Sequence, residues 1–161
     1  MIKGNKLEAF INEHCKKAIV RLTISHWWSQ TKSRPRQHGF FTVVKPMHVF
    51  KHVRHGENNS TRAIANLVIP VGAMIYVNDI AFSEGAVASH RKMRASEAFV
   101  HSIAAQRSGQ QVHEATSSWT SMFKYIVGKT VKPMKPFCKV STQCESGIHF
   151  FVNLADAKSW M

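Results

Sequence analysis

The spacing of apolar residues changes along this chain, and each change marks an expected element of secondary structure. Near the N-terminus, mostly apolar residues recur with the 3.6-residue period of an amphipathic helix and would form one face of it. These residues are Leu7, Phe10, Ile11, His14, Ala18 and Leu22. Asn5 followed by Glu8 predicts the start of this helix, because the two side chains can form a capping box. Residues 19–24 also alternate as a strand would, so both interpretations of that segment stay open.

The rest of the chain is richer in strand patterns than in helix patterns. Residues 29–39 have no apolar side chain other than Pro35 and end in Gly39, which predicts an exposed loop. Strands are then expected at 40–45, 62–69, 73–77, 122–127 and 148–152, where β-branched and aromatic residues gather or alternate. Helix formers predict a short helix over 97–105, and Asn153 is expected to cap a last helix that runs to residue 160. Residues 46–55 fit either a helix or a strand.

Together these elements predict an α+β fold in a single compact domain over residues 1–161. We expect an N-terminal helix and basic loop over 1–38, and an α+β body over 39–161 with a mostly antiparallel sheet and a short C-terminal helix. The chain is 44% hydrophobic, so one core can form unaided. The absence of a long apolar run predicts no membrane contact, and an odd set of three cysteines suits the reducing cytoplasm.

Basic residues are concentrated in the first part of the chain. Residues 1–65 hold 12 Lys and Arg against 3 Asp and Glu, 66–115 hold 4 of each, and 116–161 hold 6 against 2. The resulting net charge of +13 attracts polyanions, whereas within the folded domain it only causes self-repulsion. We therefore expect a negatively charged partner, either nucleic acid (DNA or RNA) or an acidic host protein.

The loop of residues 29–39 is the expected centre of this contact. Trp27 and Trp28 precede it and can stack on unpaired bases. An interpretation that is at least as good is that one ring anchors the helix in the core and the other covers the edge of the core. A second basic patch is expected at residues 91–94. The predicted partner-binding residues are Trp28, Lys32, Arg34, Arg36, His38, Lys51, Arg54, Arg91, Lys92 and Arg94.

Two sets of residues suggest chemistry without establishing it. His48, His52 and His55 would share one face of a helix and could hold a metal ion, whereas in a strand His55 would point away from the other two. Cys144 and His149 form a weak candidate for a catalytic nucleophile and base. A solvated basic surface and an inert buried cysteine are the commoner outcomes, so we expect neither a metal nor any other cofactor.

Two segments in the last third of the chain resemble a known family. Residues 123–133, FKYIVGKTVKP, and 143–151, QCESGIHFF, are similar to segments of a domain of unknown function found in bacteriophage and giant-virus proteins, often beside pentapeptide repeats. Residues 65–72 and 91–98 resemble its other recurring segments, so the resemblance covers about residues 62–160. The family commonly has acidic residues between the two C-terminal segments, where this chain has Lys132, Lys135 and Lys139. The resemblance implies a phage or viral origin and a compact fold, and it implies no reaction.

These observations lead to one main functional hypothesis and two alternatives. The main one is a small basic accessory protein in the cytoplasm of an infected host cell, which binds nucleic acid or a host nucleoprotein complex through an N-terminal cationic surface. The first alternative is an inhibitor that docks on an acidic patch of a host polymerase or defence complex. The second is an enzyme that acts on a nucleotide-like ligand near His149.

Overall fold

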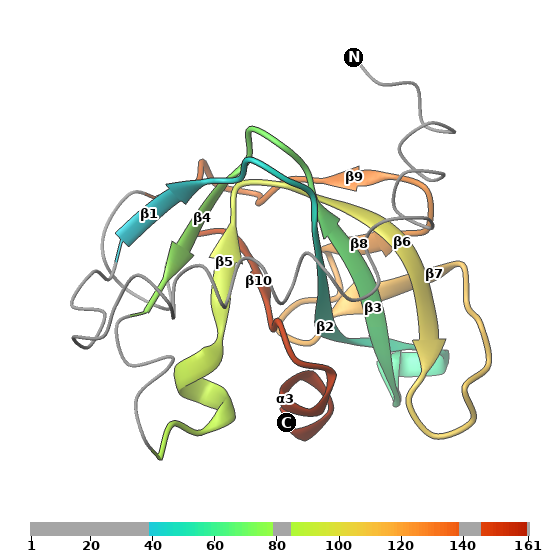
Figure 1. The fold of residues 1–161 in the computed structure, drawn as a ribbon. Coiled ribbons are helices and arrows are strands. Elements are labelled where there is room, and N and C mark those ends of the chain that lie inside the picture. The colour runs from blue at the N-terminus through green and yellow to red at the C-terminus, as the bar shows by residue number, and fades with distance from the viewer. Residues whose placement is uncertain (1–38, 79–84, 139–145, 161) are drawn as a thin grey trace.

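The computed structural model describes residues 39–78, 85–138 and 146–160, whose strands form two antiparallel sheets (Figure 1). The four-stranded sheet contains, in order, β1 (Gly39–Thr42), β4 (Met74–Val77), β5 (Met93–Ala95) and β10 (Ile148–Phe150). The six-stranded sheet contains, in order, β8 (Lys124–Ile126), β7 (Glu114–Ser117), β2 (Met47–His55), β3 (Thr61–Ile69), β6 (Ala98–Ala105) and β9 (Thr130–Val131). The described helices are two 3-10 turns, η1 (Glu57–Asn59) and η3 (Ala88–Arg91), and the α-helix α3 (Leu154–Ser159).

The β2–β3 hairpin is the centre of the six-stranded sheet. Its strands pair without interruption from Met47 opposite Ile69 to His55 opposite Thr61. The turn between them needs left-handed backbone at Gly56 (φ 81°), Asn58 (φ 55°) and Asn59 (φ 53°). Glycine and asparagine adopt this conformation more readily than other residues, so the local sequence fixes where β2 ends and β3 begins.

The core lies between the two sheets and follows the two-residue period of the strands. The six-stranded sheet contributes fully buried side chains from its central strands, including Val49, Val53, Ala65, Leu67, Ile69, Val100 and Ile103. The four-stranded sheet contributes Ile75, Ala95, Ile148 and Phe150 from the opposite side. Residues 48, 50, 52 and 54 of β2 alternate with this set and face the other way.

The two sheets are joined at two places. At one, the chain runs from β1 into β2 and from β3 into β4, and Val43 N–H donates to the Ala73 carbonyl at 2.8 Å. At the other, Phe50 and Phe151 exchange two backbone hydrogen bonds of 2.8 and 2.7 Å. The chain just beyond β10 therefore pairs with β2, which closes the structure around the core.

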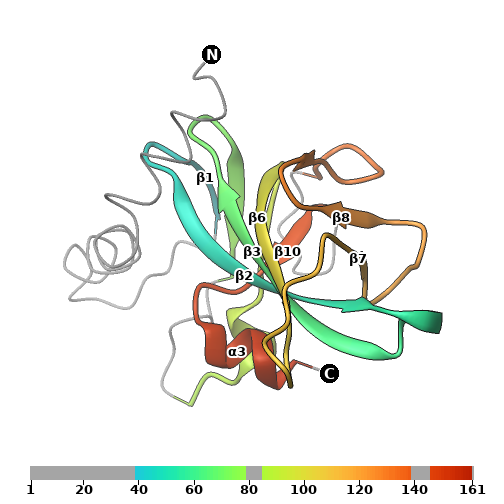
Figure 2. The same ribbon diagram turned by 90° about the vertical axis from the view of Figure 1, so that its right-hand side faces the viewer.

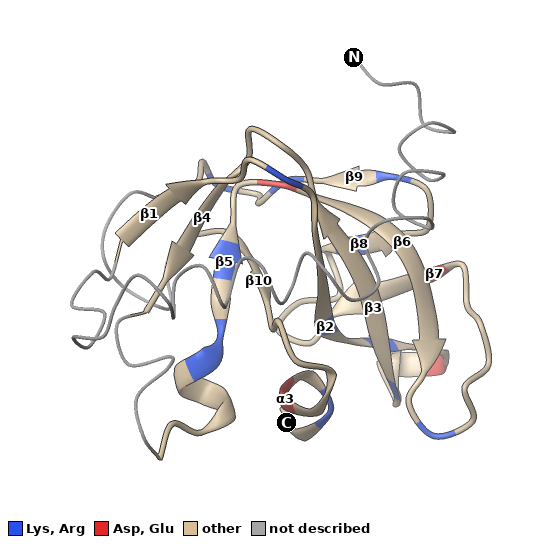
Figure 3. Ribbon diagram, in the orientation of Figure 1, with Lys and Arg blue, Asp and Glu red and all other residues tan. Residues whose placement is uncertain are grey.

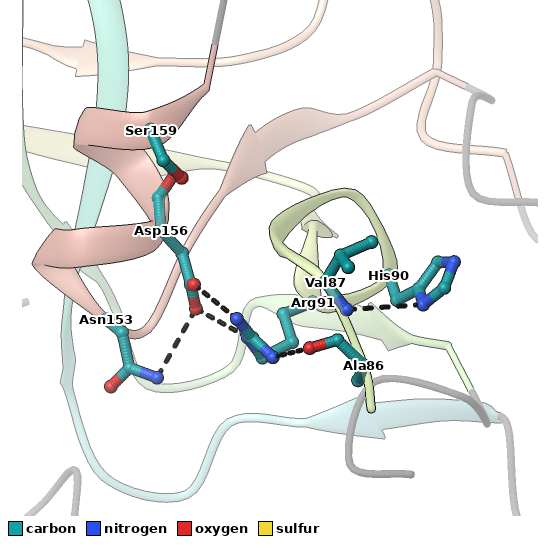
Figure 4. Close-up of polar contacts among 7 residues, drawn as sticks. All are labelled: Ala86, Val87, His90, Arg91, Asn153, Asp156 and Ser159. Atoms are coloured by element: carbon teal, nitrogen blue, oxygen red, sulfur yellow. Dashed lines mark hydrogen bonds and ion pairs between the residues drawn. The ribbon is translucent and has the colours of Figure 1, made fainter. Parts of the chain in front are cut away.

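The helix α3 covers part of the face of β2 that points away from the core (Figure 2). Phe151, Ala157 and Ile64 are buried there, with Phe50 and Trp160 packed against them. An ion pair fixes the other side of the helix, because Arg91 Nε and Nη2 each donate to a carboxylate oxygen of Asp156 at 2.7 Å (Figure 4). Arg91 also donates to the Ala86 carbonyl, so it ties the segment before β5 to α3.

The α+β prediction is wrong, because the described residues form a mostly antiparallel β-structure in which α3 is the one α-helix. The predicted N-terminal helix lies outside the described residues. Residues 97–105, predicted to be helical, contain the strand β6 instead. Val100 and Ile103 of this strand face the core, and pairing with β3 and β9 outweighs the helix propensity of its alanines.

Other elements were predicted correctly from the sequence. The expected strands at 40–45, 62–69, 73–77, 122–127 and 148–152 correspond to β1, β3, β4, β8 and β10, and the last helix corresponds to α3. Residues 46–55, left open between helix and strand, contain β2. Asn153 stands at the N-cap of α3 without a side-chain cap bond, and its Nδ2 lies 3.4 Å from Asp156 Oδ2 instead. In the part of the chain that the structure describes, no helix has the length and apolar character to cross a bilayer.

Candidate polyanion-binding surface

Four basic residues come together at the end of the six-stranded sheet that carries η1, and we call this surface the basic end. Arg54 near the end of β2 lies opposite Arg62 near the start of β3. Gln106, just after β6, donates its backbone N–H to the Arg62 carbonyl at 2.9 Å and its Nε2 to the Lys158 carbonyl at 3.1 Å. These contacts place Arg54, Arg62, Arg107 and Lys158 in one region of the surface. Figure 3 shows basic positions where β2 ends, β3 begins and the chain leaves β6.

The basic end is exposed and carries little compensating charge. Arg62, Arg107 and Lys158 are exposed, and Arg54 is partly exposed. Of the four acidic residues in the described ranges, three are paired with other cations, in Arg91–Asp156, Lys124–Glu114 and Lys132–Glu97. The fourth, Glu57, lies in η1 within the turn between Arg54 and Arg62. Within the described residues, four cations therefore face one nearby carboxylate.

His52 lies in the positive potential of this region. It is buried on β2, and its Nδ1 lies 2.8 Å from Ser118 Oγ. Burial lowers the pKa of His52, the charges of Arg54, Arg62 and Lys51 lower it further, and the result is about 4. The imidazole is therefore neutral at physiological pH, and it adds no charge to the basic end.

The structure gives the predicted partner-binding residues very different environments. Trp28, Lys32, Arg34, Arg36 and His38 lie outside the described residues. Arg54 belongs to the basic end, whereas Arg91 is engaged with Asp156. Lys92 is 9% exposed, and its ammonium lies 4.6 Å from the centre of the Trp160 ring.

Lys51 points into the core between the sheets and not toward a partner. It is 8% exposed, and its Nζ donates to the His149 carbonyl at 3.0 Å and lies 5.7 Å from the centre of the Tyr125 ring. Burial, and then the nearby charge of Lys92, lower the pKa of Lys51 to about 8. Burial also raises the pKa of Tyr125. Both side chains belong to the interior of the protein.

Arg94 is fully buried on the face of the four-stranded sheet that points away from the core. Its guanidinium lies 4.8 Å from the ring of Tyr76, 4.9 Å from Phe137 and 5.7 Å from Phe40. One guanidinium nitrogen donates to the carbonyls of Cys138 at 2.5 Å and Ser146 at 2.9 Å. Arg94 therefore anchors the two described ends of the connection between β9 and β10, and its charge is enclosed by these rings and carbonyls.

The three histidines predicted as weak metal ligands do not all share one face in the described residues, and the catalytic candidate lies partly outside them. β2 is a strand, so His48 and His52 share one face and His55 lies on the other. No group of three or more potential metal ligands occurs in residues 39–78, 85–138 and 146–160. Cys144 lies outside these ranges, and His149 pairs with Arg94 across β10 and β5.

Sequence reasoning missed Arg62, Arg107 and Lys158 at the basic end. Arg107 and Lys158 are isolated in the sequence, and only the pairing of β3 with β6 and the docking of α3 bring them together. One feature could have identified Arg62, because Arg54 and Arg62 flank a segment, HGENNST, that contains the turn formers Gly56, Asn58 and Asn59. A hairpin centred on that turn places the two arginines opposite each other.

Fold and surface together define a small, mostly antiparallel β-protein with one exposed basic end. The chain belongs to a family of unknown function (DUF5758), which it matches over residues 30–157. The predicted relation to a domain of unknown function is thereby confirmed, and the match begins further upstream than the predicted 62–160. The chain matches no curated protein and no solved structure.

Proposed function

We propose that this protein binds nucleic acid as a polyanion, and that the basic end forms part of the contact surface. The observation that carries the proposal is the position of Arg54, Arg62, Arg107 and Lys158 in one exposed region, with Glu57 as the nearby described carboxylate. Phosphates can neutralise such a cluster, and counterion release then drives binding. The predicted contacts of Lys32, Arg34 and Arg36 remain part of this proposal and would enlarge the surface.

The biological setting is also proposed. A phage or giant-virus origin, implied by the resemblance of residues 123–133 and 143–151, would make the nucleic acid or nucleoprotein of an infected cell the natural target. The site of action would then be the cytoplasm of that cell. Because phosphate contacts carry no base information, we expect weak sequence selectivity.

The salt dependence of binding tests this proposal directly. Fluorescence anisotropy with a labelled duplex, a single strand and an RNA is measured between low and moderate salt. If about five phosphates are neutralised, the slope of log K against log salt is about −4.5 on duplex DNA. Replacing Arg54, Arg62 and Arg107 together by Gln is expected to make the slope of log K against log salt less negative, by about one for each phosphate that is no longer neutralised. A slope near zero for the unmodified protein would contradict the proposal.

A charge-matched control separates the basic end from general basicity. Lys124, Lys129 and Lys132 are also exposed but lie on β8 and around β9. Replacing these three by Gln removes the same net charge, and we expect a much smaller change in slope. Equal changes in the two triple variants would show that total charge, and not the basic end, determines binding.

Digestion of the nucleic acid tests the first alternative, an acidic host protein as the partner. Pull-downs from an infected-host lysate are compared before and after nuclease treatment. Loss of the captured material on digestion supports nucleic acid as the partner. A protein that stays bound after complete digestion, and is lost with the Arg54, Arg62 and Arg107 variant, would favour the acidic-protein alternative.

A further inference from the structure

The connection between β7 and β8 presents an exposed aromatic ring. Trp119 is 79% exposed and Met122 is 78% exposed. Every other Phe, Tyr and Trp of the described ranges is buried or partly buried. An exposed indole ring contributes no burial of apolar surface to the stability of the fold. Trp119 therefore has no stabilising role in a hairpin that only connects two strands.

Hydrogen bonds hold this connection in one shape. Ser117 N–H donates to the Phe123 carbonyl at 2.8 Å, which closes the hairpin, and Trp119 N–H donates to Ser117 Oγ at 3.3 Å. Ser118 Oγ lies within hydrogen-bond distance of both the carbonyl and Nδ1 of His52 on β2. The Trp119 ring is therefore presented from a fixed backbone, which reduces the entropy lost when a ligand binds.

Trp119 lies three residues beyond a β7 position that pairs with the basic end. Thr116 pairs with Arg54 across β7 and β2, and its Oγ1 donates to the Arg54 carbonyl at 3.3 Å. Trp119 follows three residues later, a path of about 10 Å in extended chain. Residues 115–123 contain no acidic side chain, so the approach from Trp119 to Arg54 carries no opposing charge from this hairpin.

We infer that Trp119 stacks on an unpaired base, so that the preferred partner is single-stranded nucleic acid whose phosphates lie along Arg54 and Arg62. Proteins that bind single strands combine a cationic path for the backbone with aromatic rings for the bases. A duplex keeps its bases stacked on each other, so it offers Trp119 no free base face. The inference rests on the proposed function and specifies the form of the nucleic acid.

The hairpin suits a base better than a lipid bilayer. Four hydroxyl-bearing residues flank Trp119 and Met122 in the sequence, at Ser117, Ser118, Thr120 and Ser121. Insertion of this tip into a bilayer would remove these hydroxyls from water, which is unfavourable. A nucleobase offers its flat face to the indole and its polar edges to nearby hydroxyls, so it can use both kinds of group.

The test compares Trp119→Ala, Trp119→Phe and the unmodified protein on a labelled 15-nucleotide single strand and on a duplex of the same sequence. We expect Trp119→Ala to weaken single-strand binding about tenfold, because one base no longer stacks on the protein, and to leave duplex binding and the salt slope unchanged. Trp119→Phe retains a stacking ring and should keep most of the affinity. Circular dichroism confirms that each variant is folded.

Intrinsic fluorescence gives a second, independent readout. Binding of the unlabelled single strand should quench part of the tryptophan emission, and Trp119→Phe should clearly reduce that quenching. Trp160→Phe is the matched control, because Trp160 packs on Phe151 within the fold and its replacement should leave the quenching in place. Quenching of the same size in Trp119→Phe, together with unchanged single-strand affinity in Trp119→Ala, would overturn the inference.

The two proposals fail in distinguishable ways. If the Arg54, Arg62 and Arg107 variant loses affinity for both strand forms while Trp119→Ala loses none, polyanion binding stands and base stacking is wrong. If neither nucleic acid binds with a salt-dependent affinity, both are wrong. Binding to phosphatidylserine-containing vesicles that depends on both Trp119 and Met122, without a preference for single strands, would overturn the inference in favour of a membrane surface.

Discussion

Arg54 and Arg62 lie directly opposite each other on β2 and β3, at the end of the sheet that leads into η1. Like charges at directly opposed positions of an antiparallel pair repel and lower stability. The fold keeps the two arginines there although β-branched or aromatic residues would stabilise the same positions. A loss of stability of this kind is expected where function needs the two charges and a ligand neutralises them.

Replacing Arg62 by Thr is predicted to stabilise the free protein. The substitution removes the repulsion and supplies a β-branched residue, so the free energy of unfolding should rise by up to about 1 kcal/mol. Urea denaturation at low salt measures the difference in unfolding free energy between the variant and the unmodified protein. Added salt should reduce this difference, because it screens the two charges in the unmodified protein. Lys124→Thr is the control, since that exposed lysine is paired with Glu114 and its removal relieves no repulsion. A destabilised Arg62→Thr variant would show that the pair is not under strain.

Lys51 is predicted to make stability depend on pH in the alkaline range. Its pKa is 10.5 in the unfolded chain and about 8 in the core, so between these values the unfolded state holds a proton that the folded state has released. Rising pH therefore favours the folded state across this window. Relative to Lys51→Met, the unmodified protein should gain on the order of 3 kcal/mol of unfolding free energy between pH 8 and pH 10.5.

Urea denaturation of both proteins at several pH values measures this difference. Methionine has a similar length and no charge, so the variant keeps the packing beside Tyr125 and lacks the titration. Parallel curves for the two proteins through this pH range would mean that Lys51 is solvated in the folded state.

The ion pair between Arg91 and Asp156 is predicted to contribute to stability at neutral pH and to stop contributing in acid. The side-chain hydrogen bonds from Arg91 hold the pKa of Asp156 below its ordinary value of 3.8, although burial opposes this shift. The Asp156 carboxylate makes its full contribution to stability at pH values above its pKa in the unfolded chain. The contribution disappears as the pH falls through the lower pKa of the folded protein. Asp156→Asn should cost about 1 to 3 kcal/mol at pH 7, as expected for hydrogen bonds to a charged group.

Acid denaturation checks this prediction. The difference between the unmodified protein and Asp156→Asn should shrink as the pH falls below 3.8. Glu114→Gln is the matched control, because its partner Lys124 is 55% exposed and exposed pairs contribute little. A constant difference between the two proteins down to low pH would show that the Asp156 carboxylate is not the source of the effect.

The sequence predicted the strands whose patterns are local and failed where pairing decides the structure. β3 and β10 could be predicted because their apolar runs are bounded by turn formers or by a capping residue. β6 could not, because its alanines favour a helix in isolation and its strand state depends on β3 beside it. The fold class was therefore predicted with too much helix.

The candidate surface shows the same limit for charged residues. The sequence suggested that Lys51, Lys92 and Arg94 would face a partner, yet all three are buried. The prediction failed because the sequence alone does not reveal which face of a strand a charged side chain occupies. Arg94 is stabilised by aromatic rings at Phe40 and Phe137, which are far from it in the sequence. Only the tertiary structure distinguishes buried cationic side chains from those that are exposed and can contact a partner.

Gly147 is predicted to tolerate no side chain, because it lies against Arg94. A Cβ atom at this position would approach Arg94 Cβ to 2.9 Å and the Ala95 carbonyl oxygen to 3.3 Å. Gly147→Ala should therefore displace β10 or the Arg94 side chain and destabilise the protein by about 1 to 3 kcal/mol. Gly39→Ala is the control, because a Cβ there meets no atom of the described residues within 4 Å. Thermal denaturation compares the two variants, and equal stability would mean that the 146–147 segment moves away from Arg94 without cost.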